Sequence, residues 1–322
     1  MLLEPSDWSA RQDAHRERAE GLTAGHRARA RRGEKHPVED FLFTYYSYKP
    51  ALLSRWHPGA AIELADAASG RRAGWRWYVP AAHPGSLTVD DVGFRQSRAG
   101  LLRGIQGLLR STQGRTPIFG CFGLHEWAMV YRSPDRRHPL PLRLGSRGTD
   151  EVVEAHELRC THFDAFRFFT PDAVPRNREQ LERATQRDVE QPGCLHAGMD
   201  LYKWAMKAGP LVPGELLLDC FALARETRTL DMAASPYDLR DWGYAAVAIE
   251  TPAGKAEYVS RQRDLSERAQ RLRRRLRVAL QAGAQETGSH DGHADMPRPS
   301  AASSSRASAT RVAASSSRSS ES

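Results

Sequence analysis

The chain has 322 residues, of which 40% are hydrophobic and 27% are charged, and its formal net charge is +8. These values are ordinary for a globular protein, and the length suits one large core or two modest ones. No run of 18 apolar residues occurs, which argues against a membrane-spanning helix, and four cysteines are too few for a disulfide scaffold. The first residues carry no secretory signal pattern, so we expect a cytoplasmic protein.

The positive charge is confined to two short segments. Residues 255–277 hold nine basic and three acidic side chains, and residues 1–35 hold eight basic and six acidic ones. The stretch between them, 36–254, is close to neutral. It therefore lacks the basic surface that a polyanion-binding body usually carries.

Three regions are predicted along the chain. Residues 1–35 form a polar extension whose helix, over 7–32, has little apolar face and should be solvated or dependent on a partner. A globular domain spans 36–282 and ends in a long basic helix. Residues 283–322 are rich in Ser, Ala and Arg and should form a disordered tail, because they cannot bury enough apolar surface to offset the entropy of ordering.

Within the globular domain, hydrophobic periodicity predicts several helices and a few short strands. Alternation of large side chains indicates strands over 61–65 and 75–79, and 247–251 is a third candidate. Helical spacing is expected over 96–112, 124–132, 149–156, 177–189, 195–207, 214–231 and 254–282. The segment 158–171 should be a strand or irregular. The predicted fold class is α+β, as a mainly α-helical single domain.

Three of the four cysteines are followed closely by a histidine. The pairs are Cys121 with His125, Cys160 with His162, and Cys194 with His196. A carboxylate and aromatic side chains accompany each pair. Because thiols, imidazoles and carboxylates are the groups that most often ligate metals or transfer protons, these islands predict a functional site.

The first island places His125 and Glu126 at the start of a predicted helix. They diverge around the helix axis, so both line a cleft only if it lies at the helix N-terminus. The alternative is a capped helix with Trp127 and Met129 in the core.

The second island, if extended, puts Cys160, His162 and Asp164 on one face. The carboxylate would then orient the imidazole, either as a structural pair or as part of a metal triad completed by His196.

In the third island His196 and Asp200 are four residues apart and share a helical face. Cys194 at the helix N-terminus should have a lowered thiol pKa, although no protease or redox signature accompanies it. Cys220 should be a buried apolar side chain.

Two common kinds of site are not indicated. The sequence contains no glycine-rich dinucleotide or P-loop motif and no pair of CxxC knuckles. Nucleotide binding by those routes and a structural zinc site are therefore unsupported.

Six segments together resemble an actinobacterial family commonly labelled 3-methyladenine DNA glycosylase. They read HPVEDFLFTYYSYKP, RWHPG, GCFGLHEWAMVYR, CTHFDAFRFFTP, EQPGCLHAGMDLYKWA and LDMAASPYDL, and the resemblance covers most of 36–265. It implies an enzyme that binds DNA, flips out an alkylated purine and hydrolyses its N-glycosidic bond without a cofactor. The chain lacks the Leu-Pro-Gly-x-Gly hairpin of helix–hairpin–helix glycosylases. Any such activity must therefore use catalytic and DNA-binding residues in a different arrangement.

Under that resemblance, residue type and local spacing suggest roles. Asp164, and after it Asp200, would stabilise the sugar cation or activate water, while His162 and His125 orient water or the base. The expected catalytic set is Asp164, His162, Asp200, His125 and Glu126. The expected base-stacking set is Trp127, Tyr131 and Phe163. The expected DNA-backbone contacts are Arg268, Arg271, Arg274 and Arg275.

Two other functions stay open on the sequence. One is a metal-dependent enzyme acting on a small molecule, with a divalent ion held by His125, His162, Asp164 and His196 and with Asp200 as a further ligand. The other is a non-catalytic binding module in which the islands only specify the core. A single site requires the three islands to converge.

Overall fold

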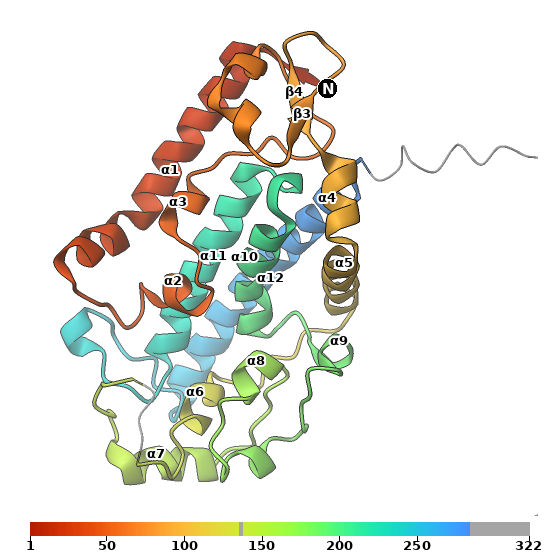
Figure 1. The fold of residues 1–322 in the computed structure, drawn as a ribbon. Helices are drawn as coiled ribbons and strands as arrows, with labels where there is room; N and C mark the ends of the chain where they lie inside the picture. Colours follow the sequence, from red (N-terminus) through yellow and green to blue (C-terminus); the bar gives the residue numbers. More distant parts are fainter. Residues whose placement is uncertain (135–137, 284–322) are drawn as a thin grey trace, which may run out of the picture. The chain divides into compact units, whose positions relative to one another are not determined.

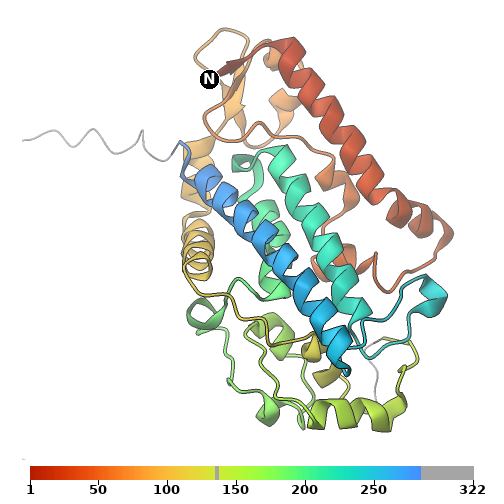
Figure 2. The same cartoon turned by 180° about the vertical axis from the view of Figure 1, so that it is seen from behind.

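Three long helices form the centre of the protein. The computed structural model describes residues 1–134 and 138–283, and Figure 1 shows their arrangement. Helices α10 (Leu195–Ala208), α11 (Gly214–Ala233) and α12 (Pro252–Gln281) pack against one another, and in Figure 2 α12 lies in front. Pro213 and Thr251 precede α11 and α12, and the Thr251 hydroxyl caps the second of these helices by accepting from the Gly254 N–H.

Helix α1 (Pro5–Arg32) packs on α11, which corrects the expectation of a solvated helix. His15, Ala19 and Thr23 are buried on its inner face. Two ion pairs link the helices. The Arg11 guanidinium lies 2.9 Å from the Glu215 carboxylate, and the Arg18 guanidinium lies 2.8 Å from the Asp219 carboxylate. The contact stripe consists of small and polar side chains, and for that reason apolar periodicity did not reveal it.

A small sheet lies beside α1, with strand order β1-β2-β4-β3. The strands are β1 (Leu2–Leu3), β2 (Glu63–Leu64), β3 (Tyr78–Pro80) and β4 (Leu87–Val89). β1 pairs with β2 in parallel, and the other pairs are antiparallel. The strand predicted over 75–79 begins at Tyr78 instead, because the 3-10 helix η2 (Arg71–Gly74) turns Trp75 over the buried Arg72.

Further helices connect these parts, and Figure 1 shows where they lie around the three-helix core. They are α2 (Phe41–Tyr45), α3 (Pro50–Leu53), η1 (Ala67–Ser69), α4 (Asp91–Ser97), α5 (Ala99–Gln113), α6 (Leu124–Ala128), α7 (Gly145–Glu154), α8 (Phe163–Phe166), η3 (Val174–Arg176), α9 (Gln186–Val189), η4 (Gly209–Leu211) and η5 (Arg240–Trp242). The predicted mainly helical α+β fold is confirmed.

Two predicted elements are wrong. The helix over 177–189 is reduced to α9, because the buried Asn177 side chain instead holds the backbone of Cys160, accepting from its N–H at 2.8 Å and donating to its carbonyl at 3.1 Å. The strand over 247–251 is a turn in which the Val247 N–H donates to the Ala233 carbonyl. Tertiary hydrogen bonds override local propensity at both places.

The predicted disordered tail, 283–322, lies outside the described residues except for Gly283. Among the residues that the structure describes, no helix is both long and apolar enough to cross a membrane.

Candidate functional site

The three Cys/His islands converge in the structure, and their histidines meet at His196. The imidazole of His196 lies edge-on to that of His125, with ring centroids 4.5 Å apart, and parallel to that of His162 at 5.3 Å. His196 belongs to α10, His125 belongs to α6, and His162 is the residue before α8. The second island reaches this place without being extended, because α8 begins at Phe163.

One side of the cluster is built on α11. Asp231, fully buried, has one carboxylate oxygen 2.7 Å from His125 Nε2 and the other 4.0 Å from His196 Nε2. One turn earlier, the buried Arg228 donates from Nη1 to Asp231 and to Glu126, each at 2.8 Å. The second carboxylate oxygen of Glu126 has no hydrogen-bond partner within the described chain.

The electrostatics of this side distinguish its two imidazoles. Burial alone would lower the pKa of His125, but the Asp231 carboxylate raises it well above its ordinary value. Burial and the neighbouring His125 charge together lower the pKa of His196 well below its ordinary value. These directions favour the charged form of His125, paired with the carboxylate, and the neutral form of His196.

The other side of the cluster is centred on His162. Its Nδ1 lies 3.1 Å from Glu190 Oε2, and its Nε2 lies 3.7 Å from Asp200 Oδ2. Burial would raise the pKa of Glu190, but hydrogen bonding to His162 and to Gln186 lowers it. The ring thus stands between two buried carboxylates, which fix its orientation.

Lys203 joins the carboxylates of Asp200 and Asp164. Its ammonium group donates to Asp200 Oδ2 and lies 3.3 Å from Asp164 Oδ2, while the Tyr46 hydroxyl donates to Asp200 Oδ1 at 2.6 Å. Burial would lower the pKa of Lys203, yet the two carboxylates raise it, so the side chain keeps its charge. Burial likewise would raise the pKa of Asp164, but Arg183 and Lys203 hold it well below its usual range.

The network approaches the surface at Asp164. The Asp164 side chain is 8% exposed, whereas Arg183 and Arg167, which cover it, are 55% and 45% exposed. Aromatic rings lie beside these charges: Phe163 lies under the Arg183 guanidinium at 4.6 Å, and Trp204 lies under Lys203 at 4.2 Å. A carboxylate of low pKa, cationic side chains and aromatic faces therefore occur together at this part of the surface.

Two of the three expected stacking residues lie in the core. Trp127 is fully buried and donates from its indole N–H to the Ala234 carbonyl at 2.8 Å. Tyr131 is 1% exposed and donates from its hydroxyl to Glu154 at 2.9 Å. Neither ring has a face open to a ligand, whereas Phe163 is only partly buried and lies under the Arg183 guanidinium.

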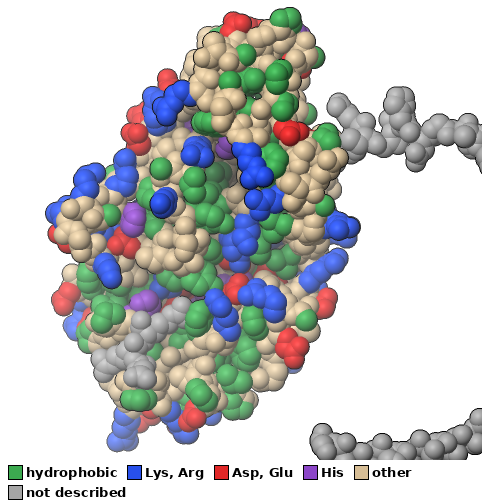
Figure 3. Space-filling model, viewed as in Figure 1, with side chains coloured by type: hydrophobic (Ala, Val, Ile, Leu, Met, Phe, Trp, Pro, Cys, Tyr) green, Lys and Arg blue, Asp and Glu red, His purple; other side chains and the backbone are tan. Residues whose placement is uncertain are grey.

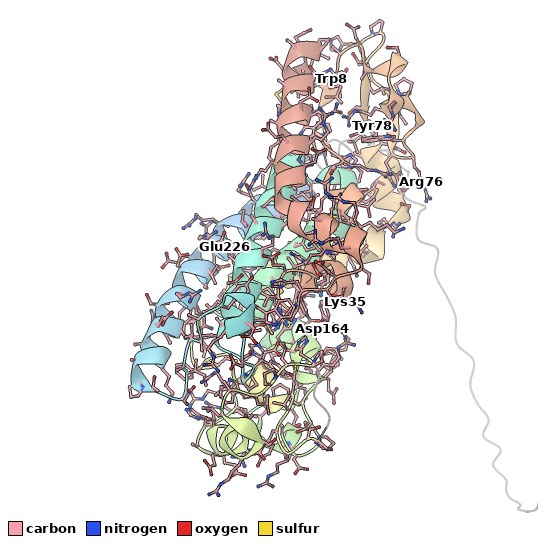
Figure 4. The ribbon with its side chains drawn as sticks, turned by 90° about the vertical axis from the view of Figure 1, so that its left-hand side faces the viewer. Trp8, Lys35, Arg76, Tyr78, Asp164 and Glu226 are labelled. Atoms are coloured by element: carbon pink, nitrogen blue, oxygen red, sulfur yellow. The ribbon has the colours of Figure 1, made fainter. Side chains whose placement is uncertain are left out.

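The expected DNA-contacting arginines lie along the outer side of α12. Arg268 forms two hydrogen bonds with Glu226, at 2.6 and 2.7 Å, and Arg275 pairs with Asp219 at 2.7 Å. Figure 4 shows Glu226 and Asp164 on opposite sides of the helical core. Arg271 and Arg274 are exposed.

Burial works against a reactive thiol at Cys194 and at Cys160. Burial raises the pKa of Cys194 well above its ordinary value, which corrects the expected lowering at the helix N-terminus. The pKa of the buried Cys160 is raised for the same reason. Cys121 Sγ is 3.5 Å from His125 Nδ1, and Cys220 is buried as expected. Desolvation of the thiolate outweighs the partial charge of a helix end.

Two groups within the described residues bring three possible metal ligands within 4.8 Å of one another. The first group is His125, His196 and Asp231. The second group is His162, Asp164 and Asp200. The structure thus divides the predicted set of four ligands between two places. The first group offers two imidazoles where the second offers one, so it is the better candidate for a transition metal.

Sequence reasoning missed Asp231, Arg228 and Glu190. The signal for the first two was present, since Arg228 and Asp231 interrupt, at helical spacing, the apolar stripe that begins with Leu217, Phe221 and Ala224 on α11. Charged side chains are almost never fully buried unless they are paired, so that interruption predicts a buried ion pair. Glu190 stands in a loop before α10, where no periodicity applies.

Comparison of the chain with protein-family models, with curated proteins and with solved structures finds no match.

Proposed function

We propose that this cluster is the active centre of a hydrolase that cleaves the N-glycosidic bond of alkylated purines, such as 3-methyladenine, in DNA. The observation that carries the proposal is the pair of carboxylates, Asp164 and Asp200, that share Lys203 where the network nears the surface. The sequence resemblance described above gives the substrate class.

Cleavage of this N-glycosidic bond needs a negatively charged group beside the sugar more than it needs a group that donates a proton. An alkylated purine already carries positive charge and leaves without being protonated, and the sugar then develops positive charge. Because its pKa is held low, Asp164 remains ionised and can stabilise that charge. His162, oriented by Glu190 and 3.7 Å from Asp200, is placed to accept a proton from the attacking water.

The aromatic rings beside Asp164 also suit a cationic base. Phe163 and Trp204 each hold a side-chain cation over the ring in the structure. An alkylated base would take the place of the Arg183 guanidinium on Phe163, since both are planar cations. Arg183, released from Asp164, would then be free to contact a phosphate of the same strand.

The test is release of free 3-methyladenine from methylated DNA. We expect release by the unmodified protein and a fall of about a hundredfold or more in Asp164→Asn. Asp172→Asn, whose side chain is 55% exposed in the same segment, is the matched control and should keep full activity. The proposal fails if the unmodified protein releases no more base than Asp164→Asn.

A second function is favoured by one observation, the group of His125, His196 and Asp231. Two imidazoles and a carboxylate form a common donor set for a divalent transition metal. We propose as the alternative a metal-dependent enzyme that acts on a small molecule. Elemental analysis should then find one ion per chain that is lost in His196→Ala and kept in His162→Gln, since His162 belongs to the other group. A protein without a stoichiometric ion would contradict it.

A further inference from the structure

A cavity of about 400 Å³ opens between α5, α9 and α12, away from the histidine cluster. It is lined by Arg103, Gln106, Gly107, Arg110, Arg187, Arg277 and Gln281. Four of these residues are arginines, and no carboxylate belongs to this lining. Figure 3 shows Lys and Arg side chains gathered over α5.

The four arginines form no ion pair with any carboxylate in the described part of the chain. Arg277 donates to the Gln113 side chain at 2.8 Å, and the Arg187 guanidinium packs against Gly107. The arginines nearby on α12 are different, because Arg268 and Arg275 each have a carboxylate partner. The positive charge of the cavity is therefore not neutralised by the protein itself.

Such an arrangement points to an anionic ligand. Like charges that face one concave surface repel each other, and a bound anion removes that repulsion. Guanidinium groups bind phosphate oxygens through paired hydrogen bonds. Arg103 and Arg110 are seven residues apart on α5, so they lie on one helical face. Their two guanidinium groups therefore follow one another along the helix axis.

One short segment contributes to both places. Arg187, which lines the cavity, follows by four residues Arg183, which pairs with Asp164.

We propose that this arginine cavity binds phosphates of the DNA backbone beside the nucleotide held at Asp164. This rests on the proposed function and replaces the backbone contacts expected at Arg268, Arg271, Arg274 and Arg275. Gly107 leaves the room in which Arg187 lies, because a Cβ there would approach the guanidinium to 3.2 Å.

The test compares two double variants of equal charge change, Arg110→Gln/Arg187→Gln in the cavity and Arg271→Gln/Arg274→Gln on α12. Binding of a short labelled duplex is measured by fluorescence anisotropy between about 50 and 200 mM salt. We expect the cavity variant to bind more weakly and to lose about 2 from the slope of log affinity against log salt, one per phosphate contact. The α12 variant should keep its slope.

Equal slopes in the two variants would overturn the proposal. It is also overturned if the cavity variant loses affinity for inorganic phosphate and keeps its affinity for DNA, because the ligand is then a free anion. Neither readout requires base release, so failure of the glycosylase activity is seen separately. Thermal melting by circular dichroism confirms that both variants are folded.

Discussion

Arg228 is the residue on which the α11 side of the cluster depends. It is buried, its Nη1 hydrogen-bonds both Asp231 and Glu126, and its guanidinium lies 3.9 Å from the Phe41 ring centroid. A buried pair of charges stabilises little in itself, but removal of one partner leaves the other charge uncompensated.

Substitution of Arg228 by Met should therefore destabilise the protein strongly. Glu126 would remain buried without a cation and Asp231 with His125 alone, and we expect a loss of about 3–5 kcal/mol in the free energy of unfolding. Urea denaturation measures it. Arg225→Met, on the same helix and without an ion pair in the described residues, should stay within about 0.5 kcal/mol. Equal effects of the two substitutions would mean that the buried pairs are not needed for stability.

The His125–Asp231 pair gives a pH dependence with a defined sign. The pKa of His125 is raised on folding, so its contribution is complete below the unfolded value of 6.5 and is lost as the pH rises toward the folded pKa. We expect the free energy of unfolding to fall above pH 6.5 and His125→Gln to abolish that slope. An unchanged slope in the variant would show that His125 is not charged in the folded protein.

At the scale of the elements, close approach between backbones decides where helices can run. A Cβ on Gly254, in the first turn of α12, would meet the Ala248 carbonyl oxygen at 2.0 Å. A Cβ on Gly21, inside α1, would meet nothing within 4 Å. The same residue type therefore has a packing role in one helix and none in the other.

The substitution Gly→Ala should have opposite effects at these two positions. Gly21→Ala should stabilise the protein by about 0.5–1 kcal/mol, because alanine favours a helix and reduces the entropy of the unfolded chain. Gly254→Ala should cost about 1–3 kcal/mol, because α12 must move away from the turn before it. Urea denaturation of both variants checks the signs, and stabilisation by Gly254→Ala would contradict the packing described.

At the scale of the whole molecule, the N-terminal 35 residues belong to the core. Helix α1 packs on α11, β1 forms an edge of the sheet, and the Trp8 indole donates to the Ala65 carbonyl at 3.0 Å. From the sequence, this segment is expected to be an extension outside the globular domain, because most of its side chains are polar.

Removal of residues 1–35 should therefore prevent stable folding. The truncation uncovers α11 and leaves β2 as an unpaired edge strand. We expect loss of the cooperative thermal transition and aggregation, measured by circular dichroism and size-exclusion chromatography. A truncated chain that melts as the full chain does would show that α1 is an appendage.

Part of the site can be predicted from the sequence. His125, His162, His196, Asp164 and Asp200 stand out because scarce side chains recur at short spacing, and the structure brings these residues together. Arg228 and Asp231 are distant from them in the chain, and only the packing of α11 beside α6 and α10 shows that they complete the cluster. Glu190 is close to His196 in the chain but stands in a loop, and only the fold brings its carboxylate to His162. Burial, which excludes Trp127 and Tyr131 from stacking on a ligand, is likewise a property of the packed core.

The sequence by itself determined the mainly helical class, the three long helices and the histidine islands, because periodicity and composition are local properties. The tertiary structure decided which charges are neutralised. Arg268 and Arg275 pair with carboxylates on α11, whereas Arg110 and Arg187 line a cavity whose lining contains none. Net charge along the chain cannot separate these cases, because electrostatic pairing depends on distance in space and on burial.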